Sequence, residues 1–256
     1  MNALWAFGMG AVAGAIIGSF LATLILRWPE ERSVAQGRSA CDSCGVVLGP
    51  MDLVPLLSAL AYRGRCRRCG EPIDPLHFSV ELGCALIGGI ALMLAPTLEG
   101  AGWAMLGWGL LTLAVLDWRH FWLPDAITLP LVFLGLTLGM WTTDIALVDR
   151  VIGAAAGYGA LVAISLGYKA WRGREGLGLG DAKLLGAIGA WFGWQALPFV
   201  LLMASLTALV VVGVSLMRTR NLDPAMRIPL GTFLCIAAVP GWWALNALTG
   251  MNAGAG

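Results

Sequence analysis

Two short polar stretches each place an acidic residue at the end of a long apolar run. Asp117 ends one such run, within residues 116–125, and Asp181 opens another, within residues 178–183. A carboxylate at the edge of a bilayer is costly, so its presence indicates a functional site. Two carboxylates at close range can share one proton and activate a water molecule between them. If the fold brings the two together, they predict an intramembrane aspartyl peptidase.

Each acid also has a structural alternative that its own neighbours support. Asp181 follows glycines and precedes an apolar run, a pattern that is typical of a helix N-cap. Asp117 could pair with Arg119 or His120 and anchor its helix at the membrane surface. Asp125 follows a proline and precedes another apolar run, so it is predicted to be an N-cap. The matched position of Asp117 and Asp181 on one side of the membrane, derived below, favours catalysis.

Two further charged residues lie close to the predicted membrane surface. Glu81 falls about one turn into an apolar run, where it would be a third buried acid or would pair with an arginine of the preceding polar segment. Lys183 is two residues from Asp181 and cannot share its helix face. We expect it to meet lipid headgroups or an acidic group of a substrate.

Four cysteines form two Cys-x-x-Cys pairs, each followed by glycine, within the single long polar segment of the sequence. The pairs are Cys41 with Cys44 and Cys66 with Cys69. Such a pair places two thiolates on one tight turn, and two pairs complete a tetrahedral zinc site. Four protein ligands leave no open position, so the predicted zinc is structural; unmetallated thiols or a redox pair are the alternatives. Cys84 and Cys235 fall inside predicted helices and are expected to be packing residues.

The composition is that of a polytopic membrane protein. The chain has 256 residues, of which 59% are hydrophobic and 12% charged, with a mean hydropathy of +0.81. A helix that crosses a bilayer needs roughly 20 mostly apolar residues, and we predict an all-α fold of about eight transmembrane helices. Their expected ranges are 4–26, 79–96, 102–118, 125–142, 149–168, 182–194, 196–217 and 229–249. The net charge of +1 gives no indication of nucleic acid as a partner.

The lysines and arginines predict the orientation of these helices. All of them except Arg150 fall in every second loop between the predicted helices, and these loops all lie on one side of the membrane. By the positive-inside rule those segments face the cytoplasm and both termini face the other side. The first apolar run is expected to be retained rather than cleaved as a signal peptide. The same alternation places Asp117 and Asp181 at the cytoplasmic ends of their helices, at similar depth.

We divide the chain into three parts: a first transmembrane helix (1–26), a cytoplasmic tetracysteine zinc loop (27–78) and a transmembrane bundle with the Gly-x-Gly-Asp motif (79–256). Within the loop, residues 53–62 are apolar but too short to cross a bilayer. We expect that segment to lie along the membrane surface.

The combination of these motifs resembles the type IV prepilin leader peptidases, the GxGD membrane aspartyl peptidases of type IV pilus and type II secretion systems. The matching segments run nearly the length of the chain. They are the tetracysteine loop, 63–73, 80–82, Asp117 with 123–130, and 178–183. Presenilin-like and preflagellin peptidases also contain the Gly-x-Gly-Asp motif, so this motif alone is not specific. The resemblance rests on the combination of all these motifs. The sequence departs from the family pattern at Asp42 and at residues 77–78.

The resemblance implies a bifunctional enzyme. It would remove the leader of prepilins or pseudopilins after a glycine and then N-methylate the new N-terminal residue, with S-adenosylmethionine as methyl donor. It implies Asp117 and Asp181 as the catalytic pair and assigns Glu81 to methyl transfer. The substrates would have a basic leader in the cytoplasm and an apolar helix in the lipid bilayer. The enzyme would be a multi-pass protein of the bacterial inner membrane with its active site facing the cytoplasm.

Two other classes of function remain open from the sequence. An ion- or proton-coupled transporter would carry protons or cations on its buried acids, but it favours inverted repeats and acids at mid-bilayer. A non-catalytic membrane scaffold would use the zinc loop to bind a partner. Within the peptidases, a presenilin-like enzyme is less favoured because the tetracysteine loop is not its pattern.

Overall fold

A computed structural model describes residues 2–34, 39–41, 43–173, 178–219 and 228–249. Arg38, Asp42, Arg174, Arg220 and Arg227 lie outside these ranges. The described residues form helices, 3₁₀ turns and two isolated β-bridges, which confirms the predicted all-α class. They form two compact units, Met1–Thr112 and Leu113–Gly256, and the division falls inside helix α4 (Leu98–His120).

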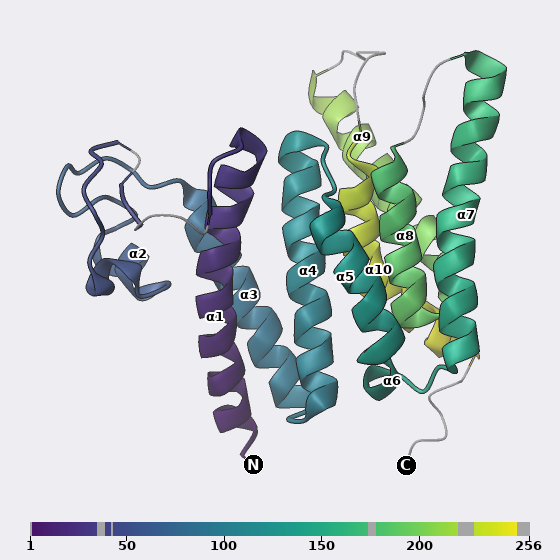
Figure 1. Cartoon of the computed structure of the whole chain (residues 1–256), viewed down its shortest axis with the longest axis horizontal. Coiled ribbons are helices and arrows are strands. Elements are labelled where there is room, and N and C mark those ends of the chain that lie inside the picture. Colours follow the sequence, from purple (N-terminus) through teal and green to yellow (C-terminus); the bar gives the residue numbers. More distant parts are fainter. Residues whose placement is uncertain (1, 35–38, 42, 174–177, 220–227, 250–256) are drawn as a thin grey trace. The chain divides into compact units, whose positions relative to one another are not determined.

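In the first unit, helices α1 (Ala3–Arg27) and α3 (Pro75–Leu94) run side by side (Figure 1). Glycines at a spacing of four on α1 explain the close packing: a Cβ on Gly10 or Gly14 would overlap the carbonyl oxygens of Gly88 and Cys84 on α3. The opposite face of α1 exposes large apolar side chains such as Ile16 and Phe20. Small residues between helices and bulky ones outside are the pattern of a helix pair in lipid.

In the described part of the segment between these two helices, the elements are short. They are 3₁₀ turns at Trp28–Glu30 and Pro50–Leu53 and the helix α2 (Leu57–Ala61). The predicted surface segment 53–62 therefore contains one five-residue helix, far below the length of a membrane span. Its apolar side chains Leu57 and Leu60 are exposed.

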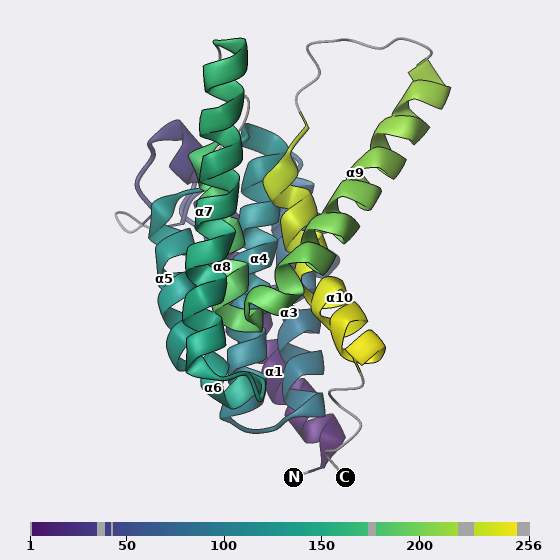
Figure 2. The same cartoon turned by 90° about the vertical axis from the view of Figure 1, so that its right-hand side faces the viewer.

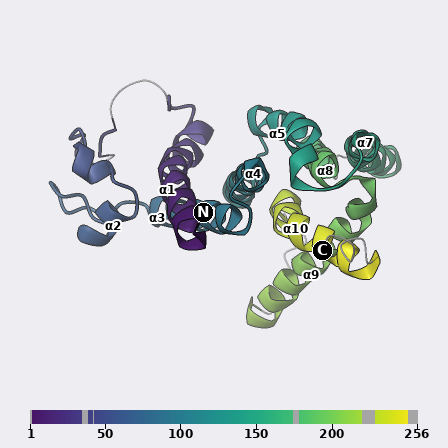
Figure 3. The same cartoon turned by 90° about the horizontal axis from the view of Figure 1, so that it is seen from below.

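The second unit is built around α8 (Leu179–Phe192), in which every residue from Leu184 to Phe192 is buried. Figure 3 shows α8 between α5 (Asp125–Thr137) and α7 (Leu147–Arg172), with α10 (Leu230–Thr249) beside it. The short α6 (Gly139–Thr142) follows α5, and a 3₁₀ turn at Trp194–Ala196 connects α8 to α9 (Leu197–Thr219). Figure 2 shows α9 crossing α10 and then diverging from it.

The predicted count of eight membrane-spanning helices is not confirmed. Among the described residues, six helices are long and apolar enough to cross a membrane. The two expected spans that fail are α5, with 13 residues, and α8, with 14. At 1.5 Å per residue these helices cover about 20 Å, less than the ~30 Å of a hydrocarbon core. The expected range 182–194 already ended where Gly193, with a φ of 73°, ends α8, so the error lay in counting so short a helix as a membrane span.

Candidate active site and metal centre

The N-terminus of α10 binds the carboxylate of Asp117. The backbone N–H of Thr232 donates to Oδ2 of Asp117 at 2.7 Å, and the backbone N–H of Gly231 also interacts with this carboxyl group. The Thr232 hydroxyl lies 3.2 Å from the same oxygen and 2.9 Å from the carbonyl oxygen of Ala114 on α4. Asp117 is only 5% exposed. Its partner is thus the start of α10, whose unpaired N–H groups favour a negative charge.

The structure brings Asp181 to the same place. Asp181 is the third residue of α8, and Gly178 occupies the N-cap position, so the N-cap alternative for Asp181 is wrong. The backbone N–H of Gly231 interacts with its carboxyl group as it does with that of Asp117, and the two carboxylates lie within range of each other's charge. Two acids from different helices therefore meet at one helix N-terminus.

Two glycines pack closely against Leu123 and Asp117 beside the acid pair. A Cβ on Gly231 would lie 3.0 Å from Oδ2 of Asp117 and 2.7 Å from the side chain of Leu123. A Cβ on Gly180, next to Asp181, would lie 3.0 Å from the same leucine. The small residues thus let α8 and α10 approach closely enough to place both acids together.

The acid pair lies at the end of α4 and the starts of α8 and α10, and α7 runs past it. Helices α7 and α8 are antiparallel, and their closest contacts join Gly153 to Gly189 and Gly157 to Leu185. One further turn of this pairing places Asp181 level with Leu161, and α7 continues from there to Arg172, about 16 Å at 1.5 Å per residue. Figure 1 shows α7 extending beyond the start of α8. Helix α7 therefore extends past the level of Asp181.

Lys183 and Asp125 form an ion pair near this site. The ammonium group of Lys183 donates to both carboxylate oxygens of Asp125 at 2.7 Å. The expectation that Lys183 meets lipid or substrate is corrected by this contact, which joins the starts of α5 and α8. Asp125 is the first residue of α5 rather than its N-cap, which is Pro124. Both side chains are partly exposed, so the pair contributes little stability.

Arg150, the exception in the charge pattern, is fully buried. Its guanidinium donates to carbonyl oxygens at the ends of three helices of the second unit. The acceptors are the carbonyls of Gly135, Gly139, Thr143, Ile145, Ala190 and Trp191 and the hydroxyl of Thr143. Helix C-termini carry partial negative charge and unpaired carbonyls, so a buried cation there is compensated. Hydrogen bonds from Arg150 thus connect the ends of α5 and α6 to the end of α8.

Replacing Arg150 by Met should lower the free energy of unfolding by about 3–5 kcal/mol, because it leaves several buried carbonyls without a donor. Arg172→Met is the matched control on the same helix, since Arg172 is exposed and lies over the ring of Trp171. Thermal unfolding of the purified protein in detergent measures both. Equal stability of the two variants would contradict this role of Arg150.

The four cysteines predicted to bind zinc cluster in the first unit. The Sγ atoms of four cysteines all lie within 4.8 Å of one another; the residues are Cys41, Cys44, Cys66 and Cys69. In each knuckle the residue after the second cysteine donates its N–H to the carbonyl of the first at 2.9 Å. These residues, Gly45 and Gly70, have φ values of 69° and 75°, which only glycine adopts freely. The glycines therefore allow both turns that bring the sulfurs together.

The electrostatics of this cluster favour a cation. The backbone N–H groups of Cys44 and Ser43 lower the pKa of the Cys41 thiol to about 6. The N–H of Glu71 acts in the same direction on Cys69, but desolvation and the neighbouring sulfurs outweigh it and raise the pKa of that thiol to about 12. One thiol of the cluster loses its proton easily, whereas a second resists because its negative charge would lie beside the first. A bound cation would allow all four thiols to ionise, and Zn²⁺ is the ion that four thiolates commonly bind.

Glu81, on α3, connects that helix to the loop. It is 6% exposed, and its Oε2 accepts a hydrogen bond of 2.8 Å from the backbone N–H of Leu56. Leu56 has a φ of 61°, a left-handed conformation that is costly for a leucine, and it precedes α2. Glu81 is thus a buried acid, as the sequence predicted, and the partner that the structure gives it is a backbone N–H of the loop, not the loop arginine of the structural alternative. Cys84 and Cys235 are buried in helices, as expected for packing residues.

Three residues of these sites were missed by the sequence reasoning. Gly231 and Thr232 supply the donors to the acid pair, and the available signal was a polar threonine in the first turn of an otherwise apolar helix. Arg150 was noted only as an exception to the charge pattern, although a lone arginine beside an apolar run suggests a buried role.

Comparison with known proteins supports the family resemblance. Residues 12–95 match the bacterial peptidase A24 N-terminal domain, and residues 104–213 match the type IV leader peptidase family. A prepilin leader peptidase/N-methyltransferase of Aeromonas hydrophila is 43% identical over 81% of this chain and 71% of its own length. Relatives of the same name from Pseudomonas aeruginosa and Burkholderia pseudomallei are 36% and 38% identical, over 91% and 87% of this chain and 87% and 80% of their own lengths. No solved structure matches significantly. The chain belongs to the type IV leader peptidase family.

Proposed function

We propose that this protein is a membrane-embedded prepilin leader peptidase and N-methyltransferase. It would remove the leaders of type IV prepilins or pseudopilins and methylate the new N-terminal residue. The observation that carries the peptidase half is the meeting of Asp117 and Asp181 at the N-terminus of α10. The relatives carry both activities in their name, which supports the methyltransferase half. Neither the family nor the geometry supports a transporter.

The acid pair would act by general acid–base catalysis. Two carboxylates at this range do not ionise together, so one is ionised and the other protonated. The ionised one takes a proton from a water molecule, which attacks the carbonyl carbon of the leader's last residue. The protonated one donates its proton to the carbonyl oxygen, and the C–N bond then breaks as the amine is protonated.

Asp117 is assigned as the ionised member. Its Oδ2 accepts a hydrogen bond of 2.7 Å from the backbone N–H of Thr232, at the start of α10. Hydrogen-bond donors stabilise the charged form of a carboxylate, and the start of a helix adds to that effect. Asp181 would therefore hold the shared proton and act as the acid.

Zinc and S-adenosylmethionine are the implied cofactors. The four clustered cysteines would hold zinc as a structural ion, without an open position for chemistry. S-adenosylmethionine supplies a methyl group bound to a positively charged sulfur. We assign Glu81 to positioning for methyl transfer, because it holds Leu56 and with it the loop that carries the zinc ligands.

The proposed topology follows the basic residues. The zinc loop, residues 27–78, and the acid pair of the bundle, residues 79–256, would face the cytoplasm from the inner membrane. A substrate would keep its basic leader in the cytoplasm and its apolar helix in the bilayer. That arrangement places the cleavage point at the end of the substrate's helix, where the acid pair could reach it.

The test uses the purified full chain, loaded with zinc, and a full-length prepilin in detergent. We expect leader removal with or without S-adenosylmethionine, and a gain of one methyl group on the new N-terminus only when it is present. Mass spectrometry of the product measures both. Intact prepilin after prolonged incubation with the folded, zinc-loaded protein would overturn the peptidase function; a cleaved but unmethylated product would overturn the methyltransferase function.

A further inference from the structure

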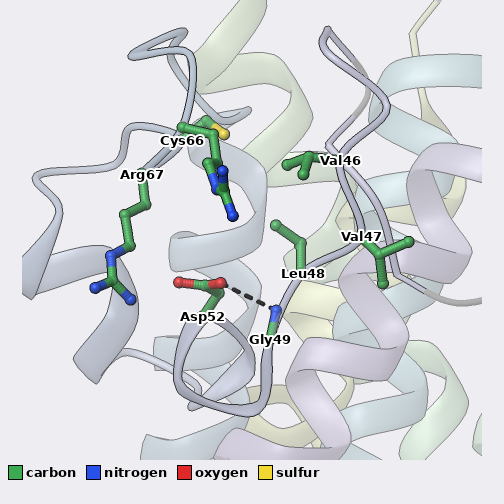
Figure 4. A pocket seen from close by; sticks show the side chains of 8 residues that line it. Val46, Val47, Leu48, Gly49, Asp52, Cys66 and Arg67 are labelled. Atoms are coloured by element: carbon green, nitrogen blue, oxygen red, sulfur yellow. Dashed lines mark hydrogen bonds between the residues drawn. The ribbon is translucent and has the colours of Figure 1, made fainter.

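Two cavities of the described residues differ in the charges that line them. The larger, of about 440 Å³, lies beside the cysteine cluster in the first unit, and Figure 4 shows Asp52 and Arg67 in its wall. Oδ1 of Asp52 is buried there without a hydrogen-bond partner, and Arg67 and Arg68 supply positive charge. The smaller, of about 190 Å³, lies in the second unit, and none of the described residues that line it is basic. The smaller cavity therefore favours a ligand that carries a positive charge.

The smaller cavity lies at the end of α8 that is far from the acid pair. Asp181 is in the first turn of α8, whereas Phe192 is its last residue and lines the cavity. The other walls come from the start of α7, the 3₁₀ turn that follows α8 and the last turns of α10. This cavity is thus separate from the site of peptide cleavage.

Asn246 of α10 is the residue that indicates a ligand. It lines the cavity and is only 7% exposed, and its Nδ2 is buried without a hydrogen-bond partner. A buried N–H group without an acceptor is costly, and most such groups in proteins are paired. The cavity therefore calls for an acceptor oxygen that the described residues do not supply.

Acceptors for a cation lie on the side of the cavity formed by α7 and the 3₁₀ turn. Oδ1 of Asp149 accepts from the indole N–H of Trp194 at 2.9 Å, which orients the carboxylate and leaves Oδ2 for a further donor. A Cβ on Gly193 would lie 2.8 Å from Oε1 of Gln195 and 3.7 Å from Cβ of Asp149, so both side chains lie against this glycine. The guanidinium of Arg150 donates to helix-end carbonyls instead.

An aromatic wall completes the lining. The rings of Phe192 and Trp242 stack with centroids 5.5 Å apart and an angle of 21° between their planes. Aromatic faces attract ammonium groups. A metal ion would leave the N–H of Asn246 without an acceptor, and a simple anion would meet the carboxylate of Asp149. The lining thus selects a group that has an ammonium and an acceptor oxygen a few bonds apart.

The surroundings of the cavity indicate where such a group comes from. Val148, Trp194 and Trp243 are next to cavity-lining residues in the sequence, and their side chains are 67%, 46% and 66% exposed. Exposed tryptophans beside apolar helices are typical of a membrane–water interface. The volume is smaller than the roughly 300–1,000 Å³ of drug-sized sites, so it suits a headgroup whose acyl chains stay outside.

We infer that this cavity binds the headgroup of phosphatidylethanolamine, with the ammonium on Asp149 and Gln195 and a phosphate oxygen on Nδ2 of Asn246. The ammonium would face the ring of Trp242, and the acyl chains would lie along exposed apolar side chains such as Val148. Under the proposed topology, this lipid belongs to the leaflet opposite the acid pair. The inference depends on neither the peptidase nor the methyltransferase activity.

The test is native mass spectrometry of the zinc-loaded full chain, released from detergent that contains equal amounts of three lipids with matched acyl chains. We expect one phosphatidylethanolamine to be retained about tenfold or more over phosphatidylcholine and phosphatidylglycerol. The trimethylammonium group of phosphatidylcholine cannot donate a hydrogen bond to Asp149, and phosphatidylglycerol has no cation.

Two variants test the assigned contacts. Asp149→Asn keeps an acceptor for Trp194 but removes the charge, and it should lower retention of phosphatidylethanolamine about tenfold. Ala146→Trp should abolish retention by filling the cavity from an exposed position, with Asp149 and Asn246 unchanged. Glu99→Gln is the matched control, because Glu99 is also an acid in the first turn of its helix but does not line the cavity. It should retain the lipid like the wild type.

Equal retention of phosphatidylethanolamine and phosphatidylcholine by the wild type would overturn the inference. So would unchanged retention in both cavity variants when their helicity and zinc content are intact; if one variant fails to fold, the other decides. Soluble phosphoethanolamine has the same polar groups without acyl chains, so it should displace the lipid only in large excess. Displacement at equal concentration would show a site for a free amine and overturn the lipid assignment.

Discussion

Asp117→Asn and Asp181→Asn should each lower the rate of prepilin cleavage by about 10³-fold or more. Neither amide can take or donate the proton that the reaction moves, and general acid–base groups contribute on this scale. Both side chains are held by N–H groups of α10 and are close to isosteric with Asn, so the fold should persist. The rate is measured from the appearance of mature pilin in detergent, with protein helicity and zinc content checked for each variant.

The acid pair also predicts the form of the pH dependence. Cleavage requires one ionised and one protonated carboxyl, so the rate should pass through a maximum and fall on both sides. Asp144→Asn is the matched control: this exposed acid belongs to the same unit but lies near the opposite end of α8, and it should leave the rate within about twofold. A well-folded Asp117 or Asp181 variant that still cleaves at the wild-type rate would refute the dyad.

Cys44→Ser should reduce zinc affinity by about 100-fold or more and loosen the first unit's loop. The substitution removes one of four thiolate ligands, and binding of structural zinc supplies much of the folding free energy of such small sites. The measurement is metal content after dialysis against a chelator, with limited proteolysis of the loop. Zinc release should increase as the pH falls, because protons then compete with the metal for the sulfurs.

Ser43→Ala provides the control for the zinc prediction. Ser43 lies in the same knuckle, is exposed and acts on Cys41 through its backbone N–H, which alanine retains. This variant should hold zinc like the wild type. Full zinc content in Cys44→Ser, or a wild-type protein that folds without any metal, would rule out the tetracysteine site.

Much of this protein was predictable because its strongest signals are local. The Cys-x-x-Cys-Gly knuckles specify their own turns, since glycine alone readily takes the φ values found at Gly45 and Gly70. Long apolar runs specify helices, and six of them have the length and composition of membrane spans. The two acids were identifiable because a carboxylate beside such a run has a high cost in lipid.

What the sequence alone could not provide depends on contacts between distant segments. The donors to Asp117 come from Thr232 and Gly231, more than one hundred residues away, and no local pattern links them. The sequence showed Arg150 only as an exception to the charge pattern, whereas its carbonyl partners Ala190 and Trp191 lie about 40 residues further along the chain.

The sequence by itself therefore determined the residue types of both candidate sites, the four cysteines that cluster and the family, because these reside in short motifs. Only the tertiary structure decided that the two acids converge on one helix N-terminus, that of α10. It also decided that an unpaired carboxylate oxygen lies in a cavity beside the cysteines. Both arise from packing between segments far apart in the chain, where the position of a side chain depends on its neighbours in space.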